Sequence, residues 1–186
     1  PFTVSEFDSS LQRIKESGAN AVLITIVGGA SVGFNMSYAG FGLDEQAIRL
    51  GTLIEENTLA GIGPDNADRL YSSSGYFATI ETEAAATFES SYTDAFGSDA
   101  PPLNGLGQSA YEGLMLLSAL ANKAGSLDVE AMDAVAEGTN WSTPRGDNTL
   151  TGRHMAQTIY LADGSGGAFN VVTSFDNVGS SEICTE

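Results

Sequence analysis

Asn20-Ala-Val-Leu-Ile-Thr-Ile-Val27 is an unbroken apolar run rich in β-branched residues, and Gly28-Gly29 ends it. Such a run, without alternating polar residues, predicts a strand that is covered on both faces. Apolar residues at helical spacing precede the run in residues 8–18, where Asp8 is the expected N-cap, and follow it in residues 31–41. The predicted order is therefore helix, strand, loop and helix.

The same alternation continues along the chain. We expect a short strand in residues 48–53, a helix in residues 54–62 and another strand in residues 70–77. Strands and helices that alternate at this spacing predict right-handed crossovers and a parallel sheet with helices on both faces. The fold class is therefore α/β, with a parallel sheet flanked by helices.

Three helices are expected after residue 77, at residues 82–96, 106–124 and 127–137. Ser126 is the expected N-cap of the third helix. In the second helix, Tyr111, Leu114 and Leu117 recur at helical spacing and are expected to be core residues.

Beyond Trp141 the chain is expected to return to β structure. Residues 155–161 and 169–175 are strand-like runs, and the turn signal Asp163-Gly-Ser-Gly-Gly167 lies between them. The helical block of residues 82–138 therefore interrupts two sheet-forming parts of the chain.

Composition excludes several classes of protein. The chain has 186 residues, 24 acidic and 7 basic, and a net charge of −17, which argues against nucleic-acid binding because the basic residues are few and scattered. With 42% hydrophobic and 17% charged residues, it can bury an ordinary core. The longest apolar stretches, residues 21–30 and 114–121, are too short to cross a bilayer. Cys184 and His154 are the only residues of their types, which excludes an internal disulfide and a His-rich metal site.

Gly29-Ala-Ser-Val-Gly33 matches the G-x-S-x-G pattern of a nucleophile elbow, after a strand and before a helix. In a serine-hydrolase hypothesis, Ser31 is the nucleophile, His154 the base and Asp147 the orienting acid. Hydrolases place that acid well before the histidine, on another strand end, and a chain rich in glycine and serine produces the pattern by chance. In the structural interpretation, Gly28 lets the backbone turn and Ser31 caps the following helix.

A third interpretation of this loop is ligand binding. In open parallel sheets, ligands bind outside the carboxyl ends of the strands, where backbone N–H groups and helix N-termini face the crevice. Residues 27–31 and 52–55 are two such strand ends, and neither carries the lysine of a phosphate-binding loop. This pattern favours a small polar ligand over a nucleotide.

Several pieces of sequence occur in the order found in one family. They are Phe7-Asp-Ser-Ser-Leu-Gln-Arg-Ile-Lys15 with Gly18-Ala-Asn-Ala-Val-Leu-Ile24, Gly40-Phe-Gly-Leu43, Ser74-Gly-Tyr-Phe77, Pro101-Pro-Leu-Asn104 with Ser109-Ala-Tyr-Glu-Gly-Leu114, and Thr143-Pro-Arg-Gly146 with Gly152-Arg-His-Met-Ala-Gln-Thr-Ile-Tyr-Leu-Ala162. Together they resemble the type I periplasmic binding proteins, the extracytoplasmic receptors of ABC importers for branched-chain amino acids, amides and urea. The amide and urea branch is the most similar, because of the Pro-Arg-Gly and Arg-His stretches.

The resemblance implies a partial Leu-binding-like fold. Family members are longer and have two α/β lobes joined by crossing strands. On this basis residues 1–77 are a second-lobe α/β segment, residues 78–138 a helical segment that belongs to the first lobe, and residues 139–186 a return to the second lobe with its closing β-hairpin. The chain begins at Pro1 with no initiator methionine or signal-peptide pattern, and we therefore expect a fragment of a longer protein.

The implied function is that of a substrate-binding component, not an enzyme. The lobes of such a receptor close on a small polar solute (an amide, urea or a branched-chain amino acid), and the closed form docks on an ABC permease in the membrane. The resemblance implies a periplasmic or extracytoplasmic location and no cofactor or metal. We expect the apolar faces of the helical segment to pack on a second copy or on the missing N-terminal lobe.

The resemblance also names the residues expected to bind the ligand. They are Val27, Gly28, Gly29, Ala30, Ser31, Thr52, Leu53, Glu55 and Tyr76. In amino-acid-binding members, an acidic side chain of the second loop pairs with the ligand ammonium, and Leu53 stands at that position here. Either Glu55 or Glu56 therefore makes this contact, or the ligand has an uncharged amide end that the Ser31 and Thr52 hydroxyls hold.

Two other functions stay open. The first is a cytoplasmic sensor of amides or amino acids on the same fold, which a signal peptide or a lipid-attachment cysteine in the full-length gene would exclude. The second is the serine hydrolase, which an active-site serine probe that labels Ser31 would support.

Overall fold

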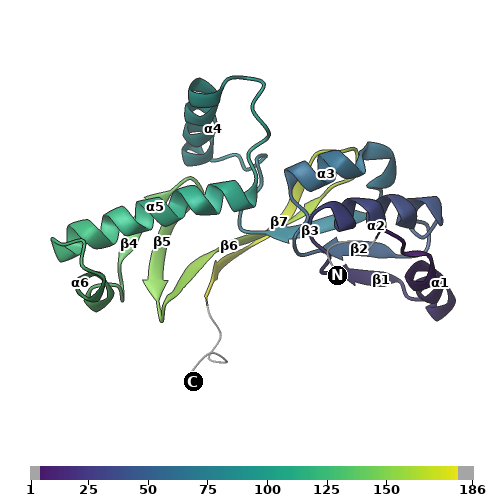
Figure 1. Ribbon diagram of the computed structural model, residues 1–186, viewed down its shortest axis with the longest axis horizontal. Helices are drawn as coiled ribbons and strands as arrows, with labels where there is room; N and C mark the ends of the chain where they lie inside the picture. The colour runs from purple at the N-terminus through teal and green to yellow at the C-terminus, as the bar shows by residue number, and fades with distance from the viewer. Residues whose placement is uncertain (1–4, 180–186) are drawn as a thin grey trace. The chain divides into compact units, whose positions relative to one another are not determined.

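The computed structural model describes residues 5–179 (Figure 1). Pro1 and Cys184 lie outside the described residues. Within residues 5–179, no helix combines the length and the apolar character that a membrane span needs. The chain divides into two compact units: the described residues of Pro1–Thr79 and Tyr160–Thr173 form unit 1, and those of Ile80–Ile159 and Ser174–Glu186 form unit 2.

Unit 1 has the predicted alternation of helices and strands. Its elements are α1 (Asp8–Ser17), β1 (Ala21–Ile24), α2 (Gly29–Gly40), β2 (Ile48–Gly51), α3 (Glu56–Ile62), the short 3-10 helix η1 (Pro64–Asn66) and β3 (Leu70–Ser74). Strands β1, β2 and β3 are parallel and adjacent in chain order. The last residues of β6 (His154–Asp163) pair antiparallel with β3, and β7 (Asn170–Val178) pairs with β6. The prediction of an α/β sheet is confirmed, with antiparallel strands added to its parallel part.

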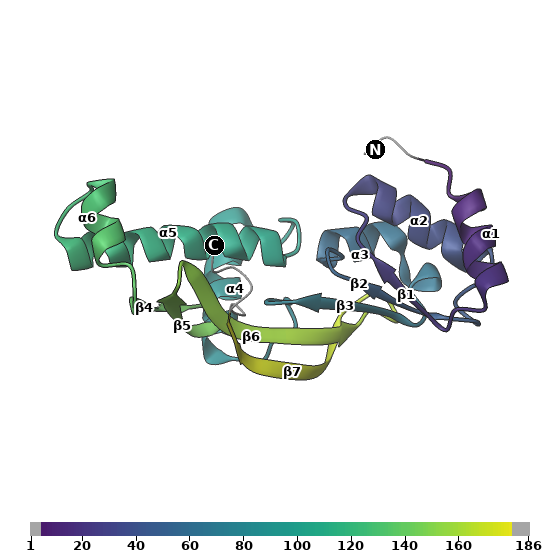
Figure 2. The ribbon, with the colours of Figure 1, turned by 90° about the horizontal axis from the view of Figure 1, so that it is seen from below.

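The helices of unit 1 lie on one face of its sheet, where Figure 2 shows α1, α2 and α3 on the same side of β1 to β3. The prediction of helices on both faces is wrong for this unit. Because the parallel strands lie in chain order, right-handed crossovers return every connecting helix to the same side. Leu23, expected in a strand covered on both faces, is 64% exposed on the other face.

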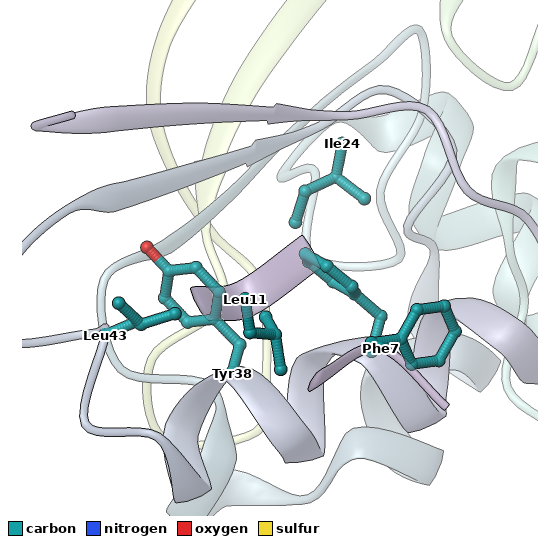
Figure 3. Close-up of a cluster of buried hydrophobic side chains, with 6 residues drawn as sticks. Phe7, Leu11, Ile24, Tyr38 and Leu43 are labelled. Carbon is teal, nitrogen blue, oxygen red and sulfur yellow. The ribbon is translucent and has the colours of Figure 1, made fainter. Parts of the chain in front are cut away.

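The core of unit 1 lies between the sheet and these helices. Phe7, Leu11, Ile24, Tyr38 and Leu43 pack there with Phe34 (Figure 3). The rings of Phe7 and Phe34 meet edge to face, with centroids 5.4 Å apart. Asp8 was expected to cap α1, but Phe7 occupies the N-cap position and no side chain caps the helix, so Asp8 contributes only its charge to the first turn.

Arg49 on β2 is fully buried beneath α2. Its Nη1 donates to Asn35 Oδ1 at 2.9 Å, and its Nη2 donates to the carbonyl oxygens of Asp68 at 2.7 Å and Asn66 at 3.0 Å. The guanidinium also lies 4.7 Å from the ring centroid of Tyr38. Burial lowers the pKa of Arg49 from its ordinary value, and these acceptors and the ring replace the lost hydration. One side chain thus joins β2, α2 and the turn before β3.

Replacing this side chain should destabilise unit 1. Arg49→Met leaves the buried acceptors of α2 and the turn without a donor, and we expect a loss of about 3–5 kcal/mol in the free energy of unfolding. The matched control Arg13→Met removes an exposed arginine of α1 that donates only to Ser10 Oγ, and it should cost less than about 0.5 kcal/mol. Urea denaturation followed by far-ultraviolet circular dichroism measures both, and equal losses would contradict this assignment.

Unit 2 contains the predicted helical block and a hairpin. Its elements are α4 (Glu83–Phe96), α5 (Gly105–Ala124), α6 (Val129–Ala134), β4 (Asn140–Thr143) and β5 (Gly146–Thr151), with the first residues of β6 paired to β5. The expected strands at 155–161 and 169–175 are confirmed as parts of β6 and β7. Ser126 does not cap α6, because Asp128 is the N-cap and accepts from the Ala131 N–H, while Ser126 Oγ accepts from the Asp128 N–H.

The two buried side chains of α5 are both polar. Gln108 and Glu112 are 0% and 2% exposed, whereas Tyr111, Leu114 and Leu117 are 47%, 68% and 48% exposed. The prediction that these three residues form the core is therefore wrong for the described residues. Helix α5 packs against α6 and β4.

A buried ion pair fixes the β4–β5 turn to α5. Arg145 in this turn has a 5% exposed side chain, and its Nε donates to Glu112 Oε2 at 2.9 Å, with Nη2 bonded to the same oxygen. A buried ion pair stabilises the fold only while both charges are present, because a single buried charge has no partner to replace its hydration. The sequence pieces Thr143-Pro-Arg-Gly146 and Ser109-Ala-Tyr-Glu112 therefore meet in the fold.

Breaking this pair should destabilise unit 2. Arg145→Ala leaves Glu112 buried without its counter-charge, and we expect a loss of about 3–5 kcal/mol, most of which the double variant Glu112→Met/Arg145→Met recovers. The fluorescence of Trp141 on β4, the one tryptophan of the chain, reports on this unit. The control Arg153→Ala breaks an exposed pair with Asp133 and should cost under about 1 kcal/mol. If Arg145→Ala lowers the free energy of unfolding by no more than the control does, the stabilising role of the buried pair is contradicted.

The division into units differs from the boundaries expected at residues 77 and 138. Residues 139–159 and the described residues from Ser174 on group with the helices of unit 2, whereas the expected boundary placed both with the final segment. The hairpin of β4 and β5 packs on α5, which accounts for this grouping. The assignment of either unit to a lobe stays a prediction.

Candidate functional site

The carboxyl ends of three strands meet at one edge of unit 1. In the register of the sheet, Ile24 of β1 lies opposite Gly51 of β2, which lies opposite Ser72 of β3. The Thr52 N–H also donates to the Ile24 carbonyl oxygen at 3.2 Å. The bends that follow β1 and β2 therefore begin side by side, as the rule for parallel sheets predicts.

The first bend turns through glycine. Gly28 has φ 62° and ψ −146°, a conformation that favours glycine, and a Cβ added at Gly28 or Gly29 would meet no atom within 4 Å. Both residues are exposed, while Val27 and Ala30 are half-buried. A molecule can thus approach the backbone of this bend closely.

Ser31 lies beneath this bend and does not cap α2. It is 0% exposed, and its Oγ has no hydrogen-bond partner among the described residues. The N-cap position belongs to Gly28, whose carbonyl oxygen accepts from the Ser31 N–H at 2.9 Å. The expectation of a Ser31 cap is therefore wrong.

The hydrolase constellation has no support in this geometry. A nucleophile must reach its substrate, and the Ser31 hydroxyl has no exposed surface. His154, the expected base, is exposed on β6 in unit 2, and the Asp147 carboxylate accepts from Ser142 Oγ at 2.6 Å. Neither the exposure of Ser31 nor the partner of Asp147 matches a catalytic role.

The second bend presents one hydroxyl and one apolar side chain. Thr52 is exposed and Leu53 is 48% exposed. Glu55 is the N-cap of α3, and its carboxylate accepts from the Asn57 N–H and the Thr58 N–H, both at 3.0 Å, and from Thr58 Oγ1 at 2.6 Å. This side chain is thus occupied by its own helix.

Glu56 is the second acidic residue of this bend. Its Oε1 accepts from the Ala78 N–H at 2.8 Å, and its Oε2 is buried with no partner among the described residues. Burial raises the pKa of Glu56, and the hydrogen bond from Ala78 opposes part of this effect. Tyr76, the expected ligand contact after β3, is 2% exposed.

Two cavities of the described structure are lined by residues of unit 2, and none of the predicted site residues lines either of them. One, of about 370 Å³, is lined by aromatic rings that include Phe88, Tyr92, Phe96 and Tyr111. Its polar groups bond internally: the Tyr92 hydroxyl donates to the Pro101 carbonyl oxygen. Ligand sites usually offer a few converging polar groups, so the edge of unit 1 is the better candidate.

Comparison with known proteins gives one family. A family model described as "Periplasmic binding protein" matches residues 1–168. Leu/Ile/Val-binding protein homolog 6 of Brucella melitensis is 29% identical over 171 residues, which are 88% of this chain and 43% of that protein. The chain thus spans less than half of this curated relative.

Solved structures share the fold. A solute-binding protein of an ABC transporter from R. palustris, in complex with benzoate, has a TM-score of 0.83 at 22% identity over 97% of this chain and 50% of that chain. A leucine-binding protein from Thermotoga maritima has a TM-score of 0.78 at 14% identity over 94% of this chain and 49% of that chain. The partial type I binding-protein fold is thereby confirmed.

The buried carboxyl of Glu56 should make stability depend on pH. Because its folded-state pKa is raised, the folded chain retains a proton that the unfolded chain releases, and stability falls as the pH rises from the ordinary glutamate value through the raised one. Glu56→Gln avoids this loss, so its stability relative to the parent chain should increase from about pH 5 to about pH 8.

Urea denaturation at both pH values measures this difference. Glu45→Gln removes the same charge from an exposed loop of unit 1 and serves as the control. A parallel pH dependence of the parent chain and Glu56→Gln would contradict the assignment.

Proposed function

This chain belongs to the periplasmic binding protein family, and from that premise we propose that it is part of the extracytoplasmic substrate-binding component of an ABC importer. In this proposal the edge of unit 1 contacts a small polar solute, an amide, urea or a branched-chain amino acid. The chain covers 43% of its curated Brucella relative, so the proposal concerns a longer protein of which these residues are one part.

One observation carries the proposal. Two bends of the kind that bind ligands, one with the accessible backbone of Gly28 and Gly29 and the other with the exposed Thr52, begin together at the carboxyl edge of a parallel sheet. Exposed backbone and a free hydroxyl suit a small molecule that forms hydrogen bonds. Proteins of the same fold were solved with benzoate and with 4-hydroxybenzoate, which are also small solutes with polar groups.

The proposed receptor works by closure. We retain the assignment of residues 1–77 to the second lobe and of residues 78–138 to the first. A solute that contacts both lobes only in the closed form shifts the equilibrium toward closure, and an ABC permease then recognises that form. This role needs binding and no bond chemistry, which agrees with the buried Ser31 hydroxyl.

The bare side of α5 supports a protein contact in addition to the solute. Leu106, Tyr111, Leu114 and Leu117 are all at least 47% exposed along this helix. Exposed apolar side chains that share one face of a helix mark an interaction face. We propose that first-lobe residues of the longer protein or a second copy of the chain cover it.

Titration of the chain with acetamide, leucine and benzoate, followed by ¹⁵N–¹H NMR, tests the proposed site. We expect the amide signals of Gly28, Gly29 and Thr52 to move at millimolar concentrations of at least one of these probes. Gly29→Val fills the bend and should weaken binding at least about tenfold, because the solute loses its approach to the backbone.

Gly40→Val is the matched control, since it adds the same side chain into open space at the other end of α2. It should leave the titration unchanged. Equal weakening by both variants would overturn the proposed site. Shifts confined to Gly107, which lines the aromatic cavity of unit 2, would also overturn it.

A further inference from the structure

The charged groups of the proposed edge are few. The three bends, residues 25–31, 52–56 and 75–78, contain no lysine, arginine, histidine or aspartate, and their only ionisable acidic residues are Glu55 and Glu56. This composition contrasts with a chain of net charge −17. The edge therefore depends on these two carboxylates for any attraction to a charged solute.

Neither carboxylate is available to a solute. Glu55 accepts hydrogen bonds from the backbone and side chains of Asn57 and Thr58, so an ammonium group would compete with the cap of α3. Glu56 Oε1 is bonded to the Ala78 N–H, and its Oε2 has no exposed surface that a solute could reach. A cation at this edge would lose water without gaining a counter-charge.

What remains accessible is neutral. The exposed groups are the glycine backbone of the first bend, the hydroxyl of Thr52 and the side chain of Leu53, which is 48% exposed. An exposed leucine beside hydrogen-bonding groups suits a solute end with apolar surface and uncharged polar atoms. It disfavours an ammonium, because a buried cation needs a partner of opposite charge.

We propose that the edge of unit 1 contacts an end of the solute that carries no positive charge and that Leu53 sets this preference. The class of ligand thus has an amide, an alcohol or an aromatic ring at this end, and any ammonium group of the solute is held by residues outside these three bends. This inference rests on the proposed function and specifies the substrate class of the same site.

Three probes of nearly equal shape test the preference: benzyl alcohol, benzylammonium and benzoate. Each is titrated into the chain in about 0.15 M salt, which screens the long-range field of the acidic chain. The amide signals of Gly28, Gly29, Thr52 and Leu53 report on binding. We expect benzyl alcohol to bind more tightly than benzylammonium, because the ammonium loses hydration at a surface that offers it no available counter-charge.

Leu53→Glu should reverse the preference. It places an accessible carboxylate at the edge, and benzylammonium should bind roughly fivefold more tightly to this variant than to the parent chain. Leu53→Gln, of similar size but neutral, should retain the order of the parent chain. Leu127→Glu adds the same charge at an 82% exposed leucine of unit 2 and should change nothing at the edge.

The outcomes separate the two proposals. If no probe moves the edge signals in any variant, the proposed solute site itself is overturned. If the probes bind at the edge of the parent chain and benzylammonium binds most tightly, only the preference against a positive charge is overturned. An equal gain in benzylammonium affinity for Leu53→Glu and Leu127→Glu would also overturn the role of Leu53, since it would trace the effect to net charge alone.

Discussion

The buried guanidinium of Arg49 is the interaction on which unit 1 depends. A charge inside a protein needs replacement of its hydration, and here an amide oxygen of α2, two carbonyl oxygens of the turn before β3 and the ring of Tyr38 supply it. These partners come from two segments, α2 and the turn before β3, so the charge on β2 can be buried only when both segments are in place. The positions of α2 and β3 relative to β2 decide where the three strand ends meet.

Local patterns predicted most of the helices and strands because spacing, caps and turns act over a few residues. The helices at 8–18 and 106–124 and the strands at 48–53 and 70–77 are examples, each correct to within a few residues. The prediction that helices cover both faces of the sheet was wrong for unit 1, since the apolar run at 20–27 does not indicate which segments lie on each face. The prediction that Leu114 and Leu117 are core residues was wrong for the same reason. Helical spacing identifies an apolar stripe, whereas burial requires a partner surface.

The candidate site was predictable in outline and not in its electrostatics. Glycine after an apolar strand placed the bends at residues 27–31 and 52–55, and the parallel register brings them together. The capping of α3 by the Glu55 carboxylate could be predicted from the sequence, because an acidic residue before a helix often caps it. The burial of Ser31 and Glu56, and the pairing of Glu112 with Arg145 across 33 residues, depend on packing between distant segments. No local pattern contains that information.

The bare leucines of α5 also affect the thermodynamics of the chain. In the chain by itself these side chains are already hydrated, so unfolding of the uncovered chain transfers less new apolar area into water than burial of the same residues would imply. The heat-capacity increment of unfolding should accordingly lie below the usual value of about 12–15 cal/mol/K per residue. A smaller increment flattens the curve of stability against temperature, so this chain loses less of its folding free energy on cooling than a fully covered domain of equal length.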